Sequence, residues 1–322
     1  MENNLFLSKF WSRIWALLID SLILGVFGYI LGLIFNNFFI SLGENAKLIG
    51  WFISLAYFSI LNSNLHNGQT FGKKMMSIQV SDISGNPVSL KTSFIRALVY
   101  TTPFFLNGFK IPGSHTFSII SIIQGIIIFT VGLGIIVFYI FNKETRQSLH
   151  DIVVKTYVVQ EYRNNEVSFM PTIKKLSFYI TGGIFLIVMA TSIYSLNSNT
   201  QLQKLVPVYE EISNQDHISN ASITMNYNLL DNSENKRLTY TIFSKVNKNL
   251  KSEDNLENNT NNPELRKAVE TFINSNVYDK EEDILSVVVS SGFNIGIASQ
   301  NYSVSFSQPI HEWKRIYKIT SK

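Results

Sequence analysis

Long apolar runs constrain this chain more than any other feature of its sequence. Phe117–Phe141 has 25 residues and Leu176–Leu196 has 21, and neither run contains a charged side chain. Ile14–Phe35 has 22 residues with one charge, that of Asp20. An α-helix needs roughly 20 apolar residues to cross the ~30 Å hydrocarbon core of a bilayer. The sequence therefore predicts that each of the three runs spans a membrane.

Two further segments are apolar but less clear. Leu48–Leu65 has 18 residues, with polar side chains at 62–64 near its end. Ile95–Phe109 is shorter and contains Arg96 and Pro103. A charged side chain is costly at the centre of a bilayer. This last segment is consistent with a short span, a half-helix or a helix that lies in the membrane interface.

Basic residues gather at the N-terminus, in the 66–96 loop and in the 142–175 loop, and such segments stay on the cytoplasmic side. Both loops share that side only if the 95–109 segment crosses or re-enters deeply, because the uncharged run after it is long enough to cross. The fold class predicted is an α-helical multi-pass domain of about five helical segments, in the cell membrane with a cytoplasmic N-terminus. The basic residues are Lys9 and Arg13, then Lys73, Lys74, Lys91 and Arg96, then Lys143, Arg146, Lys155, Arg163, Lys174 and Lys175.

Composition separates a membrane part from a more polar C-terminal part. Residues 1–196 carry 14 Lys/Arg and 8 Asp/Glu, whereas residues 197–322 carry 13 and 15. A positive excess beside apolar runs favours contact with a lipid bilayer and argues against nucleic acid. We expect three parts: a membrane domain at 1–165, a linker with the last transmembrane helix at 166–196, and a small extracytoplasmic α+β domain at 197–322.

Shorter patterns predict the elements between and after the spans. Residues 75–82 alternate like a half-buried strand, and residues 152–159 form a β-branched run, so we expect the two to pair. In the C-terminal part, helical spacing covers residues 201–212 and 263–273. Strand patterns cover residues 222–229, 238–246, 284–289 and 302–306.

Asp20 is the most informative single residue. Arg13 precedes it by seven residues, nearly two helical turns, so both side chains share one helix face about 10 Å apart. Arg96 and Arg146 are candidates to join them in one polar cluster. An intramembrane acid favours a proton or cation site. The alternative, which the residues alone favour slightly, is a structural cluster that fixes helix packing.

Glycines and lysines suggest two further features. Gly25, Gly28 and Gly32 are spaced to permit close packing of helices. The sequence from Gly68 to Lys74, GQTFGKK, superficially suggests a phosphate loop, but the spacing is one residue short and no Ser or Thr follows the lysine. Lys73 and Lys74 are instead predicted to contact anionic lipid headgroups.

Nothing in the sequence is typical of an enzyme. The chain has no cysteine, which excludes a disulfide, a thiol nucleophile and cysteine-ligated metal. His150 and Asp151 are adjacent, but no nucleophile motif accompanies them. His217 and His311 lack the spacing of metal ligands. We therefore expect no catalytic residues, no metal and no cofactor.

Three ordered motifs resemble those of the RDD family of bacterial membrane proteins, which is named for one arginine and two aspartates. Residues 13–20, RIWALLID, resemble its first-helix motif with Arg13 and Asp20. Residues 68–82, with Arg96 after them, resemble its central loop, and residues 146–159 resemble its closing motif with Asp151. The resemblance covers about residues 8–160. Gln147-Ser148 stands where the family often has a glycine.

The resemblance implies a role in transport, with sodium–proton antiport suggested for some members, and it singles out Arg13, Asp20 and Asp151. One hypothesis is therefore that the chain moves protons or small cations, with a homo-oligomer completing the pathway. The other is a membrane scaffold or anchor whose outer domain binds an envelope component or a protein. A transporter needs an exchangeable Asp20, whereas a scaffold needs it permanently paired.

Overall fold

The computed structural model describes residues 7–109, 111, 118–161, 175–198, 200–227, 237–250, 262–275 and 277–319. They form two compact units whose segments alternate along the chain. The first unit takes its described residues from Met1–Leu31, Lys47–Thr191 and Ile295–Ala298. The second takes them from Gly32–Ala46, Ser192–Asn294 and Ser299–Lys322.

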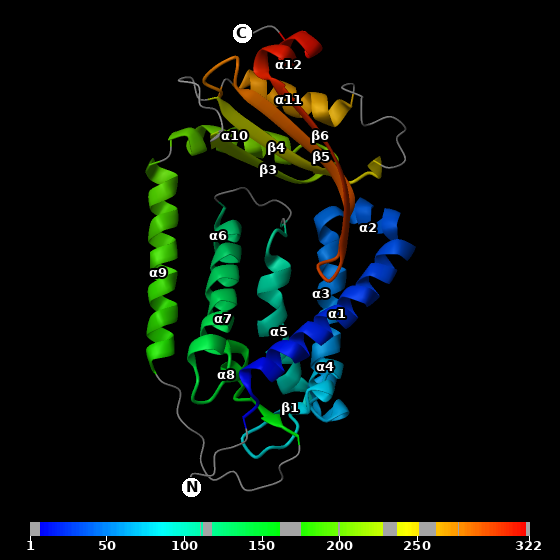
Figure 1. Ribbon diagram of the computed structural model, residues 1–322, viewed down its shortest axis with the longest axis vertical. Coiled ribbons are helices and arrows are strands. Elements are labelled where there is room, and N and C mark those ends of the chain that lie inside the picture. The colour runs from blue at the N-terminus through cyan, green and yellow to red at the C-terminus, as the bar shows by residue number, and fades with distance from the viewer. Residues whose placement is uncertain are drawn as a thin grey trace. The chain divides into compact units, whose positions relative to one another are not determined.

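The first unit is mainly helical (Figure 1). A continuous helix comprises α6, a π-helical turn at Ile127–Val131 and α7. The long α9 and the end of α1 pass from this unit into the second. The helices are α1 (Phe10–Ile34), α3 (Ala46–Leu61), α4 (Phe71–Met75), α5 (Leu90–Leu106), α6 (Ile119–Ile126), α7 (Gly132–Phe141), α8 (Leu149–Val154) and α9 (Lys175–Ser198).

Helix α1 buries its two charged side chains and exposes large apolar ones. Arg13 and Asp20 are buried, whereas Trp11 and Leu22 are 66% and 68% exposed. Only 22% of its most apolar stretch is buried, and for the continuous helix Ile119–Phe141 the value is 11%. A helix in the core of a soluble protein is mostly buried, and its exposed face is polar. The reversed pattern is stable where lipid, and not water, surrounds the exposed face.

Two described helices are long and apolar enough to cross a bilayer, α1 and the helix Ile119–Phe141. They correspond to the first and fourth predicted segments. Within α9 the described apolar stretch is shorter, Phe178–Thr191. Helices α3 and α5 have 16 and 17 residues, fewer than the roughly 20 that a perpendicular span needs. The structure therefore has a helix at each predicted segment, but length alone supports crossing for two of them.

A small antiparallel sheet joins the loops that precede α5 and follow α8. Strand β1 (Ile78–Ser81) pairs with β2 (Tyr157–Gln160), as the sequence predicted. The predicted second strand was too long at its start, because residues 152–154 complete α8. Lys155 then adopts a left-handed conformation that ends this helix and redirects the chain into β2. Ala16 of α1 packs with the core of this sheet.

The second unit contains a four-stranded sheet with three helices on one face (Figure 1). The strand order is β3-β4-β5-β6, with β4 and β5 parallel and the other pairs antiparallel. Parallel neighbours need a crossover connection, and α11 lies between β4 and β5 in the chain. The strands are β3 (Ile218–Tyr227), β4 (Leu238–Val246), β5 (Ile284–Asn294) and β6 (Ser299–Pro309), and the helices are α10 (Thr200–Ser213), α11 (Pro263–Asn274) and α12 (Ile310–Tyr317).

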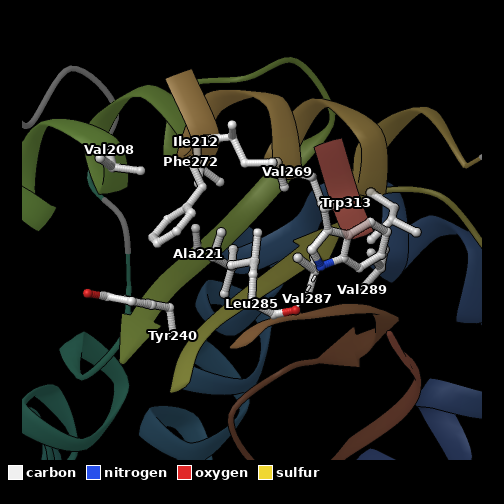
Figure 2. Close-up of a cluster of buried hydrophobic side chains, with 14 of the residues drawn as sticks. Val208, Ile212, Ala221, Tyr240, Val269, Phe272, Leu285, Val287, Val289 and Trp313 are labelled. Carbon is white, nitrogen blue, oxygen red and sulfur yellow. Dashed lines mark hydrogen bonds between the residues drawn. The ribbon is translucent and has the colours of Figure 1, made fainter. Parts of the chain in front are cut away.

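An apolar core holds these helices against the sheet (Figure 2). Phe272 of α11 and Trp313 of α12 are completely buried, and the Trp313 indole N–H donates to the Leu285 carbonyl oxygen at 2.9 Å. The four strands and two helices predicted for residues 197–322 are all present, and α12 was not predicted. The unit also includes α2 (Asn36–Leu42), after which Glu44 pairs with Lys245 of β4 at 3.4 Å.

Candidate functional site: a polar cavity among the helices of the first unit

The buried carboxylate of Asp20 is held by three donors. Its Oδ1 accepts from the Tyr57 hydroxyl at 2.7 Å and from the Gly72 backbone N–H at 2.8 Å. Its Oδ2 accepts from the Thr70 hydroxyl at 2.6 Å. Asp20 is only 1% exposed, and a buried charge needs such donors to offset the loss of water. The contacts fasten α1 to α3 and to the start of α4.

The sequence of residues 68–74, GQTFGKK, explains how this segment approaches the Asp20 carboxylate. Thr70 is the N-cap of α4, and its hydroxyl accepts from the Lys73 backbone N–H. Gly68 has a φ of +70°, which favours glycine. A Cβ at Gly72 would overlap the Ala16 carbonyl oxygen, so only glycine permits this approach of α4 to α1. The loop does bind an anion, but that anion is the chain's own Asp20.

Asp151 and Arg96 form a buried ion pair between α8 and α5. The Arg96 Nε and Nη2 atoms both lie 2.8 Å from Asp151 Oδ1. The same carboxylate accepts from the Thr156 hydroxyl and from the Ser148 backbone N–H, which caps the start of α8. Asp151 is 1% exposed, so the pair sits away from water.

The charges around Asp151 fix the protonation of this pair. Burial alone raises the pKa of Asp151, but attraction to Arg96, His150 and Arg13 outweighs burial and holds its pKa well below the usual range. Burial, followed by the repulsion of nearby cations, lowers the pKa of His150 to about 3. Asp151 is therefore ionised and His150 neutral at physiological pH. The His150 Nε2 atom is 3.6 Å from Asp151 Oδ2.

Arg13 lies on the same face of α1 as Asp20, as predicted, but the two are not paired. Its Nε donates to the Ser8 hydroxyl at 2.6 Å, Nη2 donates to the Val158 carbonyl oxygen at 3.2 Å, and Nη1 donates to the Arg146 carbonyl oxygen. The Arg146 side chain donates in turn to the Ser8 carbonyl oxygen at 2.9 Å. These two arginines hold the N-terminal residues to β2 and to the loop before α8.

Lys73 and Lys74, both predicted to contact lipid headgroups, have different surroundings. Lys74 is exposed, whereas the Lys73 side chain lines a cavity. Within the described residues, no hydrogen bond or ion pair is made by the Lys73 ammonium. Burial, followed by the repulsion of Arg96, lowers the pKa of Lys73 to about 7, although Asp20 and Asp151 oppose that shift.

The cavity has a volume of about 350 Å³. Arg13 and Asp20 of α1, Lys73 of α4, Arg96 of α5 and Asp151 of α8 all contribute to its wall. Four of the five residues predicted for the polar cluster therefore meet at one cavity, whereas Arg146 lines a neighbouring depression beside it. Within the described parts of the chain, no group of three or more His, Asp or Glu side chains is placed to hold a metal ion.

The predicted packing glycines of α1 are covered by the end of β5 and the turn that follows it, and not by another helix. A Cβ at Gly25 would contact the Ile297 carbonyl oxygen, and one at Gly28 would lie 2.7 Å from the Ile297 side chain. In the second unit, a Cβ at Gly32 would overlap the Phe293 ring. Small residues do permit close approach here, but the neighbour is a β-hairpin segment that the helical spacing alone does not reveal.

Sequence reasoning also missed two groups that complete the site. Tyr57 is an ordinary aromatic residue in an apolar run, so nothing in the sequence marks its hydroxyl as a partner of Asp20. Thr70 carried a weak signal, because a threonine before a short helical stretch is a typical N-cap. Only the fold shows that its hydroxyl also donates to a carboxylate from α1.

Lipid-facing helices around buried charges define a membrane-embedded helical protein. The model of the RDD family matches residues 7–155, which include Arg13, Asp20, Arg96 and Asp151. Residues 7–155 are therefore similar to the RDD family, as the sequence motifs indicated. Neither a curated protein nor a solved structure matched the chain.

Replacing Asp151 by Asn is expected to lower the free energy of unfolding by about 3–5 kcal/mol, because Arg96 is left as an unpaired buried charge. The matched control is Glu270→Gln, which breaks a surface pair with Arg266 and should leave stability nearly unchanged. Because the folded pKa of Asp151 is lowered, wild-type stability from this group is present above pH ~4 and is lost at lower pH. Denaturation in detergent across pH measures both effects, and equal losses in the two variants would contradict them.

Replacing Gly72 by Ala is expected to destabilise the first unit by about 1–3 kcal/mol, since the new methyl group meets the backbone of α1. Gly125→Ala is the control, because a Cβ there has no atom within 4 Å. Its effect should stay within about 1 kcal/mol and favour the helix. Thermal unfolding of both variants in the same detergent checks the difference.

Proposed function

We propose that the chain is a multi-pass membrane protein with five crossings, a cytoplasmic N-terminus and an extracytoplasmic C-terminal domain. Pairing of β1 with β2 supports a common side for the 66–89 and 142–161 segments. The N-terminal residues share that side, because the Ser8 N–H donates to the Val158 carbonyl oxygen. These segments carry the excess of basic residues, which marks the cytoplasmic side.

Contacts within the second unit support an extracytoplasmic position for the α1–α3 connection and the C-terminal sheet. The connection between α1 and α3 belongs to the same unit as the C-terminal sheet, and Glu44 pairs with Lys245 there. If α1 crosses the membrane, this connection lies outside the cytoplasm, and the C-terminal sheet lies with it. The return of the chain to β1 and later to β2 then requires α3, α5 and the helix Ile119–Phe141 to cross as well.

Single cysteines test this topology cleanly, since the natural chain has none. We expect Lys267→Cys, on an exposed position of α11, to react with a membrane-impermeant maleimide in intact cells. Lys143→Cys, exposed in the loop after α7, should react only after lysis. The reverse pattern, or reaction of both in intact cells, would contradict the proposed orientation.

Within this topology we propose that the RDD region moves protons, with the Lys73 amine as the exchanging group. The observation that carries the proposal is a lysine that has no hydrogen-bond or ion-pair partner among the described residues and lies on the wall of a cavity between membrane helices. Burial, followed by Arg96 and Arg13, disfavours its charged form, and Asp20 and Asp151 favour it. The balance sets a pKa of about 7, which suits a group that gains and loses a proton near neutral pH.

The carboxylates are less suited to exchange. Asp20 accepts from Tyr57, Thr70 and Gly72, and Asp151 is paired with Arg96. A bare sodium or potassium ion would have to displace these donors in a cavity that holds three cationic side chains. Protonation of Lys73 displaces none of them. Any coupled cation would therefore use a route other than these two carboxylates.

A scaffold or anchor remains the second candidate, because the same donors also keep Asp20 and Asp151 permanently paired. The C-terminal unit favours it too, since a separate sheet with its own core is not required for proton movement. In that case the outer domain would bind an envelope component or a protein partner. A homo-oligomer is compatible with either function.

Proton flux in proteoliposomes distinguishes the two candidates. With an imposed sodium or potassium gradient, the wild type should change the internal pH, and Lys73→Met should reduce the rate at least about tenfold. Lys73→Arg should fail as well, because guanidinium stays charged at all relevant pH values. Lys74→Met, one residue away and exposed, should keep the wild-type rate.

The wild-type rate should also change around pH 7, where Lys73 titrates. Full activity of the Lys73→Arg variant would show that charge, and not proton exchange, is what the site needs. Absence of flux in a well-inserted wild type, with either gradient, would remove proton movement under those conditions and favour the scaffold.

A further inference from the structure

The same cavity has two chemically different parts. One part carries the side chains of Lys73, Arg96 and His150. The remaining wall is apolar and aromatic, with Phe58 from α3 and Ile135 from α7 among its members. A small inorganic ion gains nothing from an apolar wall, whereas a ligand with a charged head and a hydrocarbon chain matches both parts.

Two polar groups at the charged part have unfilled hydrogen-bonding capacity. Within the described residues, the Lys73 ammonium has no acceptor. The His150 Nδ1 atom is buried without a hydrogen-bond partner, and this side chain is about nine-tenths buried. An unpaired polar group in such a place costs free energy unless something binds to it. An acceptor that entered the cavity would satisfy the Lys73 ammonium.

The charge balance selects the sign of that ligand. Arg96 is neutralised by Asp151, while Asp20 already accepts from three donors. Arg13 donates to oxygen atoms of the protein that carry no net charge. When Lys73 is protonated, the cavity wall has one positive charge more than its two carboxylates offset. The complementary head is therefore an anion that accepts hydrogen bonds.

The exposed rim of the cavity points to the source of the ligand. Phe104, Ile136 and Ile140 line the cavity and are 54%, 51% and 47% exposed. They belong to α5 and α7, and exposed apolar side chains on these helices face the hydrocarbon of a membrane. A ligand that enters between them comes from the bilayer and not from water.

We propose that this cavity binds a single-chain anionic amphiphile from the membrane, with its carboxylate or phosphate head against Lys73 and its hydrocarbon chain along the apolar wall. The volume of about 350 Å³ accommodates a head and part of one chain. The inference goes beyond proton movement and does not depend on it, because it rests on the shape and chemistry of the cavity.

Photo-crosslinking tests the site with the full-length protein in nanodiscs of zwitterionic lipid. The probes are a long-chain carboxylate with a diazirine in its chain, the phosphate monoester of the same chain, and the corresponding neutral alcohol. We expect saturable labelling of α5 and α7 peptides by at least one anionic probe, at a concentration about tenfold lower than for the alcohol. Comparison of the two anionic probes identifies the preferred head.

Variants locate the head. Lys73→Met should raise the concentration needed for half-maximal labelling about tenfold, and Lys73→Arg should restore most of the affinity because it keeps the charge. Lys74→Met is the matched control and should behave as wild type. If Lys73→Met does not fold, the comparison of anionic and neutral probes on the wild type still decides the question.

Equal labelling by the anionic and neutral probes would overturn the proposal, as would non-saturable labelling by all three. Labelling that is the same in the Lys73→Met and Lys74→Met variants would also overturn it. A protein that binds the carboxylate probe but moves no protons would support this site and contradict only the proton proposal. The two proposals therefore fail on different measurements.

Discussion

The buried ion pair of Arg96 and Asp151 is the interaction on which the rest of the first unit depends. An arginine in an apolar helix is tolerated only with a partner, and Asp151 supplies one from the other end of the RDD region. The same carboxylate caps α8 and accepts from Thr156 just before β2. Helix α5, helix α8 and the start of the small sheet therefore meet at one charge.

Asp20 plays the corresponding part on the opposite wall. Its three donors fix the loop before α4, and this loop carries Lys73 to the cavity. Asp20, which the sequence suggested as an exchanging group, is thus a positioning group. The titratable amine is that of Lys73, outside the spanning helices. Because Asp20 and Asp151 are already paired, the Lys73 amine is the group available for proton exchange or ligand binding.

The sequence predicted the candidate site in outline because charges in apolar runs are few. Arg13, Asp20, Arg96 and Asp151 were singled out, and all four line the cavity. The partners within that set were not predictable, since Arg13 bonds to backbone oxygens and Arg96 takes the carboxylate. Lys73 was predicted to contact lipid headgroups, but its side chain lies on the cavity wall. The local sequence could not distinguish the two, because the same residues around a lysine beside a membrane segment fit either surrounding.

The sequence by itself determined where the apolar helices lie, that Arg13 and Asp20 share one face of α1, and that the 75–82 and 152–159 segments pair. These features follow from local periodicity and from the cost of exposing charge to lipid. Only the tertiary structure decided that Tyr57 and Thr70 hold Asp20, that Gly72 lets α4 approach α1, and that Lys73 meets no hydrogen-bond acceptor in the part of the chain that the structure describes. Each depends on segments more than 30 residues apart in the chain meeting within hydrogen-bond distance, or failing to meet. Such distances are set by how whole helices pack, and no local pattern encodes them.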